Sequence, residues 1–355
     1  TCSNWTYGYG DSATFDVGTG DTLSILQLLL NANTLGYSVT SLTKTGPGSL
    51  EIRSAGADSD KNRAYQGVTT LRNGTLLLSE DDFGTLSGVT NPFNGRTYSG
   101  TGGSLGYSSF TNTVIVGDSG TLSTDSLALI ANGNGRYVGH NIEVFNKGSS
   151  VTLGMTTGTV LFAGSLTLHR DVTLSGPADG ILVFSNIVAA ADFSGTGLPT
   201  LSGLGGLRFE GAVPSGLSLV VGGRALRFGS SAVCATTLNS LSLGAATAAT
   251  LDVDFAAGAN DTIAATSLVL SNTAVNLYYA SSGLPFAEPG TYTLFTYSGA
   301  LGGSVSMLGV GNPQSGVSYV FSNDTAHARV LLAIAPTAGN TVPVWKSTTG
   351  GSWGT

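Results

Sequence analysis

The chain has 355 residues, of which 52 are glycine, and only 10% of its residues are charged. With 41% apolar residues it is too hydrophobic for a disordered chain. The formal net charge is −7 and the 14 basic residues are scattered, which argues against nucleic acid or anionic lipid as a partner.

Composition favours an all-β fold. Helices are built mainly from Ala, Glu, Lys and Leu, and Glu and Lys are scarce here, whereas glycine turns recur throughout the chain. The longest apolar run, residues 25–30, falls far short of the ~20 residues that a membrane-spanning helix needs. We therefore expect no membrane insertion.

Short strands are expected between the glycine turns. In residues 166–168 leucine alternates with threonine, a period of two that gives one buried and one solvated face. Such a unit cannot bury its apolar row alone, so copies must stack on one another. The predicted strands are Ser49–Arg53, Gly74–Ser79, Thr113–Val116, Val151–Leu153, Ser165–Leu168, Asp171–Leu174, Ile181–Phe184, Leu207–Phe209, Leu217–Val221, Ala225–Phe228, Leu238–Leu243, Thr250–Phe255, Ser267–Leu270 and Ala274–Tyr278.

Two architectures compete for these strands. A β-sandwich usually carries a core tryptophan, but the three tryptophans, Trp5, Trp345 and Trp353, all lie near the termini. A parallel β-solenoid (β-helix) needs only neighbouring rungs in contact. We expect the solenoid over residues 21–285, preceded by an N-terminal joining segment over residues 1–20.

Leucines that follow glycine turns are expected to point into the solenoid. Gly-Thr-Leu and Gly-Ser-Leu recur along the chain and mark a turn followed by a strand. The leucines expected inside are Leu50, Leu76, Leu122, Leu153, Leu166 and Leu168.

Two segments are expected to be loop insertions. Residues 55–63 are the most charged stretch, and residues 80–106 are long and polar with several aromatic residues. Loops of this kind often carry the binding surfaces of solenoids. Asp58 and Asp60 resemble the opening of a calcium loop, but Arg63 stands where such a loop needs glycine, so no metal site is expected.

Two stretches of the chain match a repeat pattern. LTKTGPGSLEI at residues 42–52 is followed, after a polar spacer, by YQGVTTLRNGTLLL at residues 65–78. This resembles the autotransporter-associated β-strand repeat of large bacterial surface proteins, which reads LxKxGxGxLxL and then YxGxTxVxxGTLxL. Arg72 and Asn73 depart from the family, which often has a small residue there. The resemblance implies a β-solenoid displayed outside the bacterial cell.

The C-terminal part resembles the closing segment of the same family. GTYTLFTYSG at residues 290–299 is followed by aromatic and aliphatic strands at residues 317–321 and 328–334. The resemblance implies a C-terminal aromatic antiparallel β cap over residues 286–336. Residues 337–355 would then be a linker or tail that opens the next module or contacts the next subunit.

A motif that opens modules of this family is divided between the two ends of the chain. Read from end to start, Trp345, Trp353, Trp5 and Phe15 stand in the order of that motif. Three explanations stay open: one period of a tandem protein, a window cut across neighbouring modules, or subunits joined head to tail. These four residues are the predicted assembly interface, and the alternative is that the tryptophans cap the two ends independently.

Candidate catalytic or metal-binding groups are sparse. His140, His169 and His327 are far apart and have no ligand at metal-binding spacing, so we expect exposed or rim histidines. Asp252 and Asp254 share a strand face, which we interpret as a solvated face. No catalytic residue, cofactor or metal ion is therefore predicted.

The two cysteines are expected to remain unpaired within one chain. Cys2 and Cys234 would lie many rungs apart in a straight solenoid, whereas a disulfide needs Cα atoms within about 7 Å. We interpret Cys234 as a buried thiol and Cys2 as a residue that could bridge subunits.

The predicted function is that of a structural module in an extracellular bacterial fibre, filament or stalk. We expect the chain to be a segment or processed product of a longer protein, with copies of itself as partners, joined head to tail. An adhesin that binds surface glycans through residues 80–106 is the alternative. A glycan-degrading β-helix is a more distant one.

Overall fold

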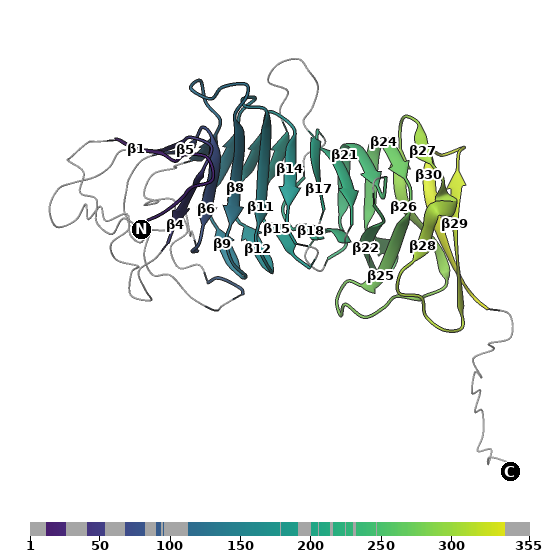
Figure 1. Ribbon diagram of the computed structural model, residues 1–355. Coiled ribbons are helices and arrows are strands. Elements are labelled where there is room, and N and C mark those ends of the chain that lie inside the picture. Colours follow the sequence, from purple (N-terminus) through teal and green to yellow (C-terminus); the bar gives the residue numbers. More distant parts are fainter. Residues whose placement is uncertain are drawn as a thin grey trace, which may run out of the picture.

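The protein is an all-β, parallel β-solenoid (Figure 1). The computed structural model describes residues 12–25, 41–53, 68–81, 90–93, 95, 113–177, 179–190, 200–204, 206–213, 216–223, 225–229, 232–245 and 247–337. Within these residues there is no α-helix, only a short 3-10 helix, η2 (Val305–Met307). The predicted fold class is confirmed.

Three sheets form the walls of the solenoid. Sheet 1 contains, in order, β1 (Ser12–Asp16), β3 (Ser41–Thr45), β5 (Val68–Leu71), β7 (Thr113–Val116), β10 (Asn141–Val144), β13 (Leu166–Leu168) and β16 (Val188–Ala190). Sheet 2 contains β2 (Thr22–Ile25), β4 (Ser49–Ile52), β6 (Gly74–Leu78), β8 (Ser126–Ala131), β11 (Ser150–Met155), β14 (Val172–Ser175), β17 (Thr200–Leu204), β19 (Ser218–Gly222), β21 (Ala235–Leu243), β24 (Thr262–Leu270), β26 (Gly290–Tyr297), β30 (Arg329–Pro336) and β29 (Val317–Asp324), with β27 (Leu301–Gly303) beside β24.

Sheet 3 begins later in the chain than the other two. Its order is β28 (Leu308–Val310), β25 (Thr273–Tyr279), β22 (Ala249–Ala256), β20 (Ala225–Phe228), β18 (Gly206–Phe209), β15 (Ile181–Phe184), β12 (Thr159–Phe162) and β9 (Arg136–Val138), and β23 (Ala259–Asn260) pairs with β22. Along the stack, strands of successive rungs pair in parallel, for example β8 with β11 and β12 with β15.

The core is a set of apolar columns that run along the stack. Leu50, Leu76, Leu129, Leu153 and Leu174 occupy successive register positions in sheet 2 and are all buried. Threonine and other polar residues alternate with them on the outer face, as the period of two predicts. Each apolar row therefore lies between the rows of the neighbouring rungs, within one core that all three sheets share.

An aromatic column lines the inner side of sheet 3. Phe162, Phe184, Phe209 and Phe228 stand in register on four successive strands. Their rings stack with centroids 5.4, 5.4 and 5.6 Å apart. The spacing is slightly larger than the 4.7–4.9 Å between strands, which suits rings that stack with an offset.

The predicted inward leucines are correct with one exception. Leu50, Leu76, Leu153, Leu166 and Leu168 are buried, whereas Leu122 is 65% exposed. Leu122 lies in the turn between β7 and β8, where its backbone N–H donates to Asp125 Oδ2 at 2.7 Å. The Gly-Thr-Leu sequence there belongs to the turn, and the strand begins only at Ser126.

The C-terminal end differs from the rest of the stack. β26 pairs in parallel with β24 on one side and antiparallel with β30 on the other, and β30 pairs antiparallel with β29. These strands form the yellow end of the molecule in Figure 1. β27 and β28 still pair in parallel with the rungs before them, so the parallel stack and the antiparallel strands overlap within residues 290–336.

The N-terminal boundary also differs from the one expected. β1 lies within residues 1–20 yet pairs in parallel with β3, so it is a rung of sheet 1. The predicted insertion at residues 55–63, with Asp58 and Asp60, lies outside the described residues.

Candidate functional site

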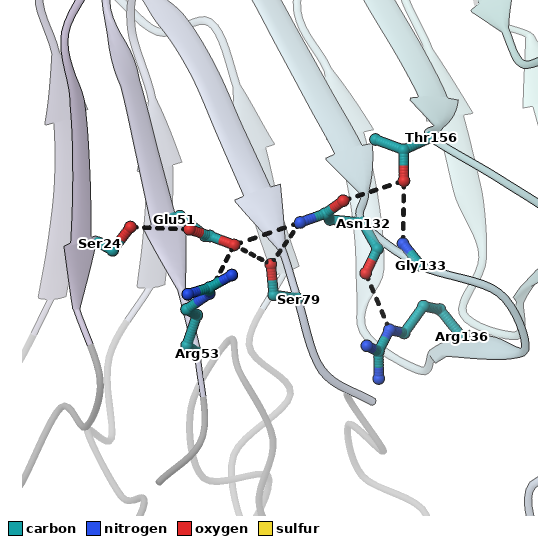
Figure 2. Close-up of polar contacts among 8 residues, drawn as sticks. All are labelled: Ser24, Glu51, Arg53, Ser79, Asn132, Gly133, Arg136 and Thr156. Atoms are coloured by element: carbon teal, nitrogen blue, oxygen red, sulfur yellow. Dashed lines mark hydrogen bonds and ion pairs between the residues drawn. The ribbon is translucent and has the colours of Figure 1, made fainter.

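A polar ladder crosses several rungs on one side of sheet 2 (Figure 2). Glu51 of β4 is buried and accepts hydrogen bonds from Ser24 Oγ at 2.7 Å and Ser79 Oγ at 2.5 Å. Arg53 Nε forms an ion pair with the same carboxylate at 2.8 Å. Burial alone would raise the pKa of Glu51, but these donors together hold it below its usual value.

The ladder continues through Asn132, which follows β8. Its Nδ2 donates to Ser79 Oγ at 2.8 Å and to Glu51 Oε1 at 3.2 Å, and its Oδ1 accepts from Thr156 Oγ1 at 2.9 Å. Figure 2 shows one continuous chain of contacts from Ser24 to Thr156. Ser24, Glu51, Ser79, Asn132 and Thr156 stand on five successive rungs, so the chain of contacts ties these rungs together, which is a structural role.

Cationic side chains fasten the corner between sheets 1 and 2. Lys44, on the buried side of β3, is fully buried, and its Nζ donates to the carbonyls of Thr45, Gly46 and Asn73 at 2.6, 2.7 and 3.1 Å. Burial lowers the pKa of Lys44 to about 8 despite the nearby charge of Asp16. The ammonium thus joins the turns of two adjacent rungs.

Glycine is required where these turns stack. Gly74 has a φ of +75°, and a Cβ atom there would lie 2.3 Å from the Gly48 carbonyl oxygen and 2.9 Å from Lys44 Nζ. A larger residue would therefore push the two turns apart. Close packing of the two turns is therefore sufficient to explain why Lys44, Gly48 and Gly74 stand at these positions.

Arginines act in the same way along this corner. Arg72 forms a two-pronged ion pair with Asp118 of the next rung at 2.8–2.9 Å. Arg170 donates to the carbonyls of Lys147, Gly148 and Ser149 on the rung before it. These contacts again join rungs.

The sequence predicted that Asp252 and Asp254 share a solvated face of β22, and this prediction is wrong for Asp254. Asp254 is fully buried, and both of its carboxylate oxygens accept from Arg227 Nη2 at 2.8 Å. Arg227 lies on β20 with its guanidinium 6.0 Å from the centre of the Tyr278 ring. The expectation fails for Asp254 because an arginine on the neighbouring strand, rather than water, compensates its charge.

Asp252 has a different environment from Asp254. It accepts from Asn276 Nδ2 at 2.8 Å, and burial raises its pKa, only partly offset by Asn276 and by the charge of Arg227. Two carboxyl groups in contrasting environments can divide acid and base roles. Asp254, however, is inaccessible in this structure, so the pair has no open face on which both groups meet a substrate.

Cys234 lies next to a third carboxyl group. Asp261 accepts the backbone N–H groups of Cys234 at 2.7 Å and of Asp254 at 2.8 Å. Burial, with the adjacent Asp261, raises the pKa of the Cys234 thiol to about 12. The thiol is only partly buried, but it stays protonated near neutral pH and is a poor nucleophile. Cys2 lies outside the described residues.

The histidines do not gather into a site. His140 is buried, contrary to the expectation of an exposed or rim position, because it lies in the tight turn where Gly164 packs on its backbone. His169 stacks on Phe145 and contacts Glu143 at 2.9 Å, and His327 is exposed and contacts Asp324. In the part of the chain that the structure describes, no three His, Cys, Asp or Glu side chains are arranged to hold a metal ion.

Part of the predicted insertion at residues 80–106 is fixed to the solenoid. Asp81 and Asn91 are buried and hydrogen-bonded to each other, Asn91 Nδ2 to Asp81 Oδ2, at 3.0 Å. Both also bond to backbone groups next to and within β9. This contact could not be predicted from sequence pattern, because the two residues stand 44 or more positions from their backbone partners in the chain.

Of the predicted assembly residues, only Phe15 is described. It lies on β1, is 5% exposed, and stands in register with Lys44 of β3, so its ring is part of the solenoid core. Trp5, Trp345 and Trp353 lie outside the described residues. The grouping of these four residues therefore stays a prediction.

Comparison with known proteins returned neither a matching family model nor a similar curated protein. Among the described residues, no helix has the length and hydropathy to cross a bilayer. The resemblance to autotransporter-associated repeats therefore remains a prediction based on the motifs.

Proposed function

We propose that this chain is a structural module of an extracellular bacterial fibre, filament or stalk that joins head to tail with copies of itself. The observation that carries the proposal is the unbroken register from rung to rung, with leucine and phenylalanine columns along the stack. Parallel strands about 4.8 Å apart, each bonded to the next, give an elongated element with a fixed length per rung.

The polar contacts support a mechanical role. The ladder from Ser24 to Thr156 and the corner contacts of Lys44, Arg72 and Arg170 all connect one rung to another. These charged and polar side chains are thus engaged in contacts along the axis. A polar group used in this way resists separation of the rungs instead of meeting a ligand.

The two ends of the stack differ, which suits a head-to-tail joint. Among the described residues, β1 and β2 are the first strands of sheets 1 and 2, whereas antiparallel β30 and β29 follow β26 at the other end. Contact between two unlike surfaces on identical subunits forms a filament when the repeated rotation does not close into a ring. Residues 344–355 are proposed to contact residues 1–15 of the next module.

The joint can be tested by deleting residues 344–355 and by the double substitution Trp345→Ala/Trp353→Ala. Electron microscopy should show end-to-end oligomers of the full chain and single modules of both variants. Phe93→Ala, at an exposed aromatic residue of the insertion, is the matched control and should assemble normally. Unchanged oligomers in both variants would rule out the tryptophans as the joint.

A second candidate is an adhesin that binds glycans through residues 80–106. The observation in its favour is that buried Asp81 and Asn91 fix this insertion to β9, and a loop held on a rigid scaffold suits recognition. A glycan array probed with the wild-type chain and with a variant that has residues 96–106 replaced by a Gly-Ser linker would test it. Equal binding by the two would exclude this loop.

A further inference from the structure

Sheet 3 begins a few rungs later than sheets 1 and 2, at β9. β9 pairs in parallel with β12 through Tyr137 and its neighbours. Within the described residues, no strand pairs with the other edge of β9. An unpaired edge is a template for pairing with another chain.

Two side chains occupy this edge. Asn91 Nδ2 donates to the carbonyl of Gly135 at 2.9 Å, and Asp81 Oδ1 accepts the backbone N–H of Tyr137 at 3.1 Å. The bonds are buried, with Asn91 fully enclosed. Asn91 thus donates to a carbonyl and Asp81 accepts from an N–H group, as the backbone of a neighbouring strand would do.

The two side chains are held in place by further bonds. Asn91 Nδ2 also donates to Asp81 Oδ2 at 3.0 Å, and Asn91 Oδ1 accepts the N–H of Phe93 at 2.8 Å. The second bond fixes which way the Asn91 amide faces. In addition, a Cβ atom at Gly135 would lie 3.2 Å from Phe93 Cβ, so the insertion packs closely on the edge.

We propose that Asp81 and Asn91 form an edge clamp that prevents β9 from pairing with a strand of a second copy of this chain. The edge groups of Gly135 and Tyr137 have the pattern that a parallel strand would use, and the clamp satisfies both. This inference stands without the proposed function. If the chain also forms fibres, the clamp removes one lateral contact that would compete with joining at the ends of the stack.

The double substitution Asp81→Ala/Asn91→Ala removes both bonds and should expose the edge. Sedimentation velocity over a hundredfold concentration range should then show reversible self-association that the wild type lacks. Hydrogen exchange at the Tyr137 amide should be at least tenfold faster in the dilute variant, and protection should return as the concentration rises. Working with residues 344–355 deleted separates this contact from any end-to-end joint.

Two controls make the test specific. Asn186→Ala removes a similar side-chain amide bond, to the Ala163 carbonyl at 3.3 Å. This bond joins the segments that follow the paired strands β15 and β12, away from the edge of β9, so the variant should stay monomeric. Single Asn91→Ala leaves the Asp81 bond to Tyr137 and should associate more strongly than the wild type but more weakly than the double variant. Its comparison with the wild type still tests the proposal if the double variant does not fold.

The proposal fails if the folded double variant stays monomeric although the Tyr137 amide exchanges faster. It also fails if association occurs without renewed protection of β9, because the contact then lies elsewhere. Unchanged exchange at Tyr137 would mean that the clamp does not protect the edge at all.

Discussion

Lys44 is the residue that best shows how a charge can serve this fold. It stands two residues after Leu42 on the same, buried side of β3, where the alternating pattern predicts an apolar residue. The long side chain instead delivers an amine to three backbone carbonyls at a corner. Buried carbonyls without a partner cost about 1–3 kcal/mol each, so the amine offsets a real penalty.

The lowered pKa of Lys44 predicts a rise in stability at alkaline pH. The folded pKa is about 8 and the ordinary value is 10.5, so between them the unfolded chain binds more protons than the folded one. Folding is therefore favoured as the pH rises from 8 to 10.5, by up to about 3 kcal/mol. Denaturant unfolding of the wild type and Lys44→Met at pH 8, 9 and 10.5 should show the gain only in the wild type.

A free-energy difference between the two proteins that stays constant over this pH range would show that Lys44 titrates normally. Lys44→Met should also be less stable than the wild type at every pH, because the three carbonyls lose their donor.

At the scale of the element, each strand contributes one position to every core column. Leu76 of β6 stands between Leu50 and Leu129 and is fully buried. Leu76→Asp should cost about 4 kcal/mol or more, because it leaves a cavity and buries a carboxyl group without a partner. Leu122→Asp, at a leucine that is 65% exposed, should change the melting temperature little. Equal melting temperatures for the two variants would contradict the register described here.

The phenylalanine column of sheet 3 should also be sensitive to truncation. Phe209 has a stacked ring on both sides, Phe184 at 5.4 Å and Phe228 at 5.6 Å. Phe209→Ala should destabilise the protein by about 3–5 kcal/mol in urea unfolding. Phe93→Ala, at a ring that is partly exposed, is the control and should cost less than 1 kcal/mol by comparison. A loss below about 1 kcal/mol at Phe209 would mean that the column does not stabilise the stack.

Strands were the most predictable part of the fold. Thr113–Val116, Ile181–Phe184 and Ala225–Phe228 have the bounds that alternation and glycine turns predict. Leu122 was placed wrongly because a Gly-Thr-Leu sequence fits both a strand start and a turn, and hydrogen bonds to Asp125 decide for the turn. Local pattern alone cannot separate the two cases.

The surroundings of the outer-face polar residues were not predictable in the same way. Asp254 looked solvated because its alternation places it outside, but its burial depends on Arg227, 27 residues earlier in the chain. The contacts of Asp81 and Asn91 with β9 likewise depend on how an insertion folds back. Such contacts depend on which residues of neighbouring rungs lie side by side, and the local sequence pattern does not predict this register.

At the scale of the whole molecule, contacts between neighbouring rungs should confine damage. In a stack of this kind the free energy of unfolding is approximately the sum of the stability of each rung and the interaction energy between adjacent rungs. Distant rungs do not contact each other. Leu76→Asp should therefore raise hydrogen exchange in β4, β6 and β8 while β22, β24 and β25 keep their protection. Loss of protection along the entire chain would show a single cooperative unit instead.

Sheet 1 offers a natural boundary for such local opening. Its last strand in the described residues is β16, and in the next rung residues 210–213 take its place. A hollow of about 320 Å³ lies there between residues 209–213 and 234–236. If the end of sheet 1 is such a boundary, hydrogen exchange in residues 209–213 should exceed that in the neighbouring strands of sheet 2.

The offset between β8 and β11, where Ser126 pairs with Ser150, has a consequence for how such a protein can evolve. One rung corresponds here to 24 residues, so a duplication or loss of that many codons adds or removes a rung without disturbing the columns on either side. Each event would change the reach of the molecule by about 4.8 Å. Length then becomes a trait that selection can adjust in small equal steps, independently of whatever the ends of the molecule attach to.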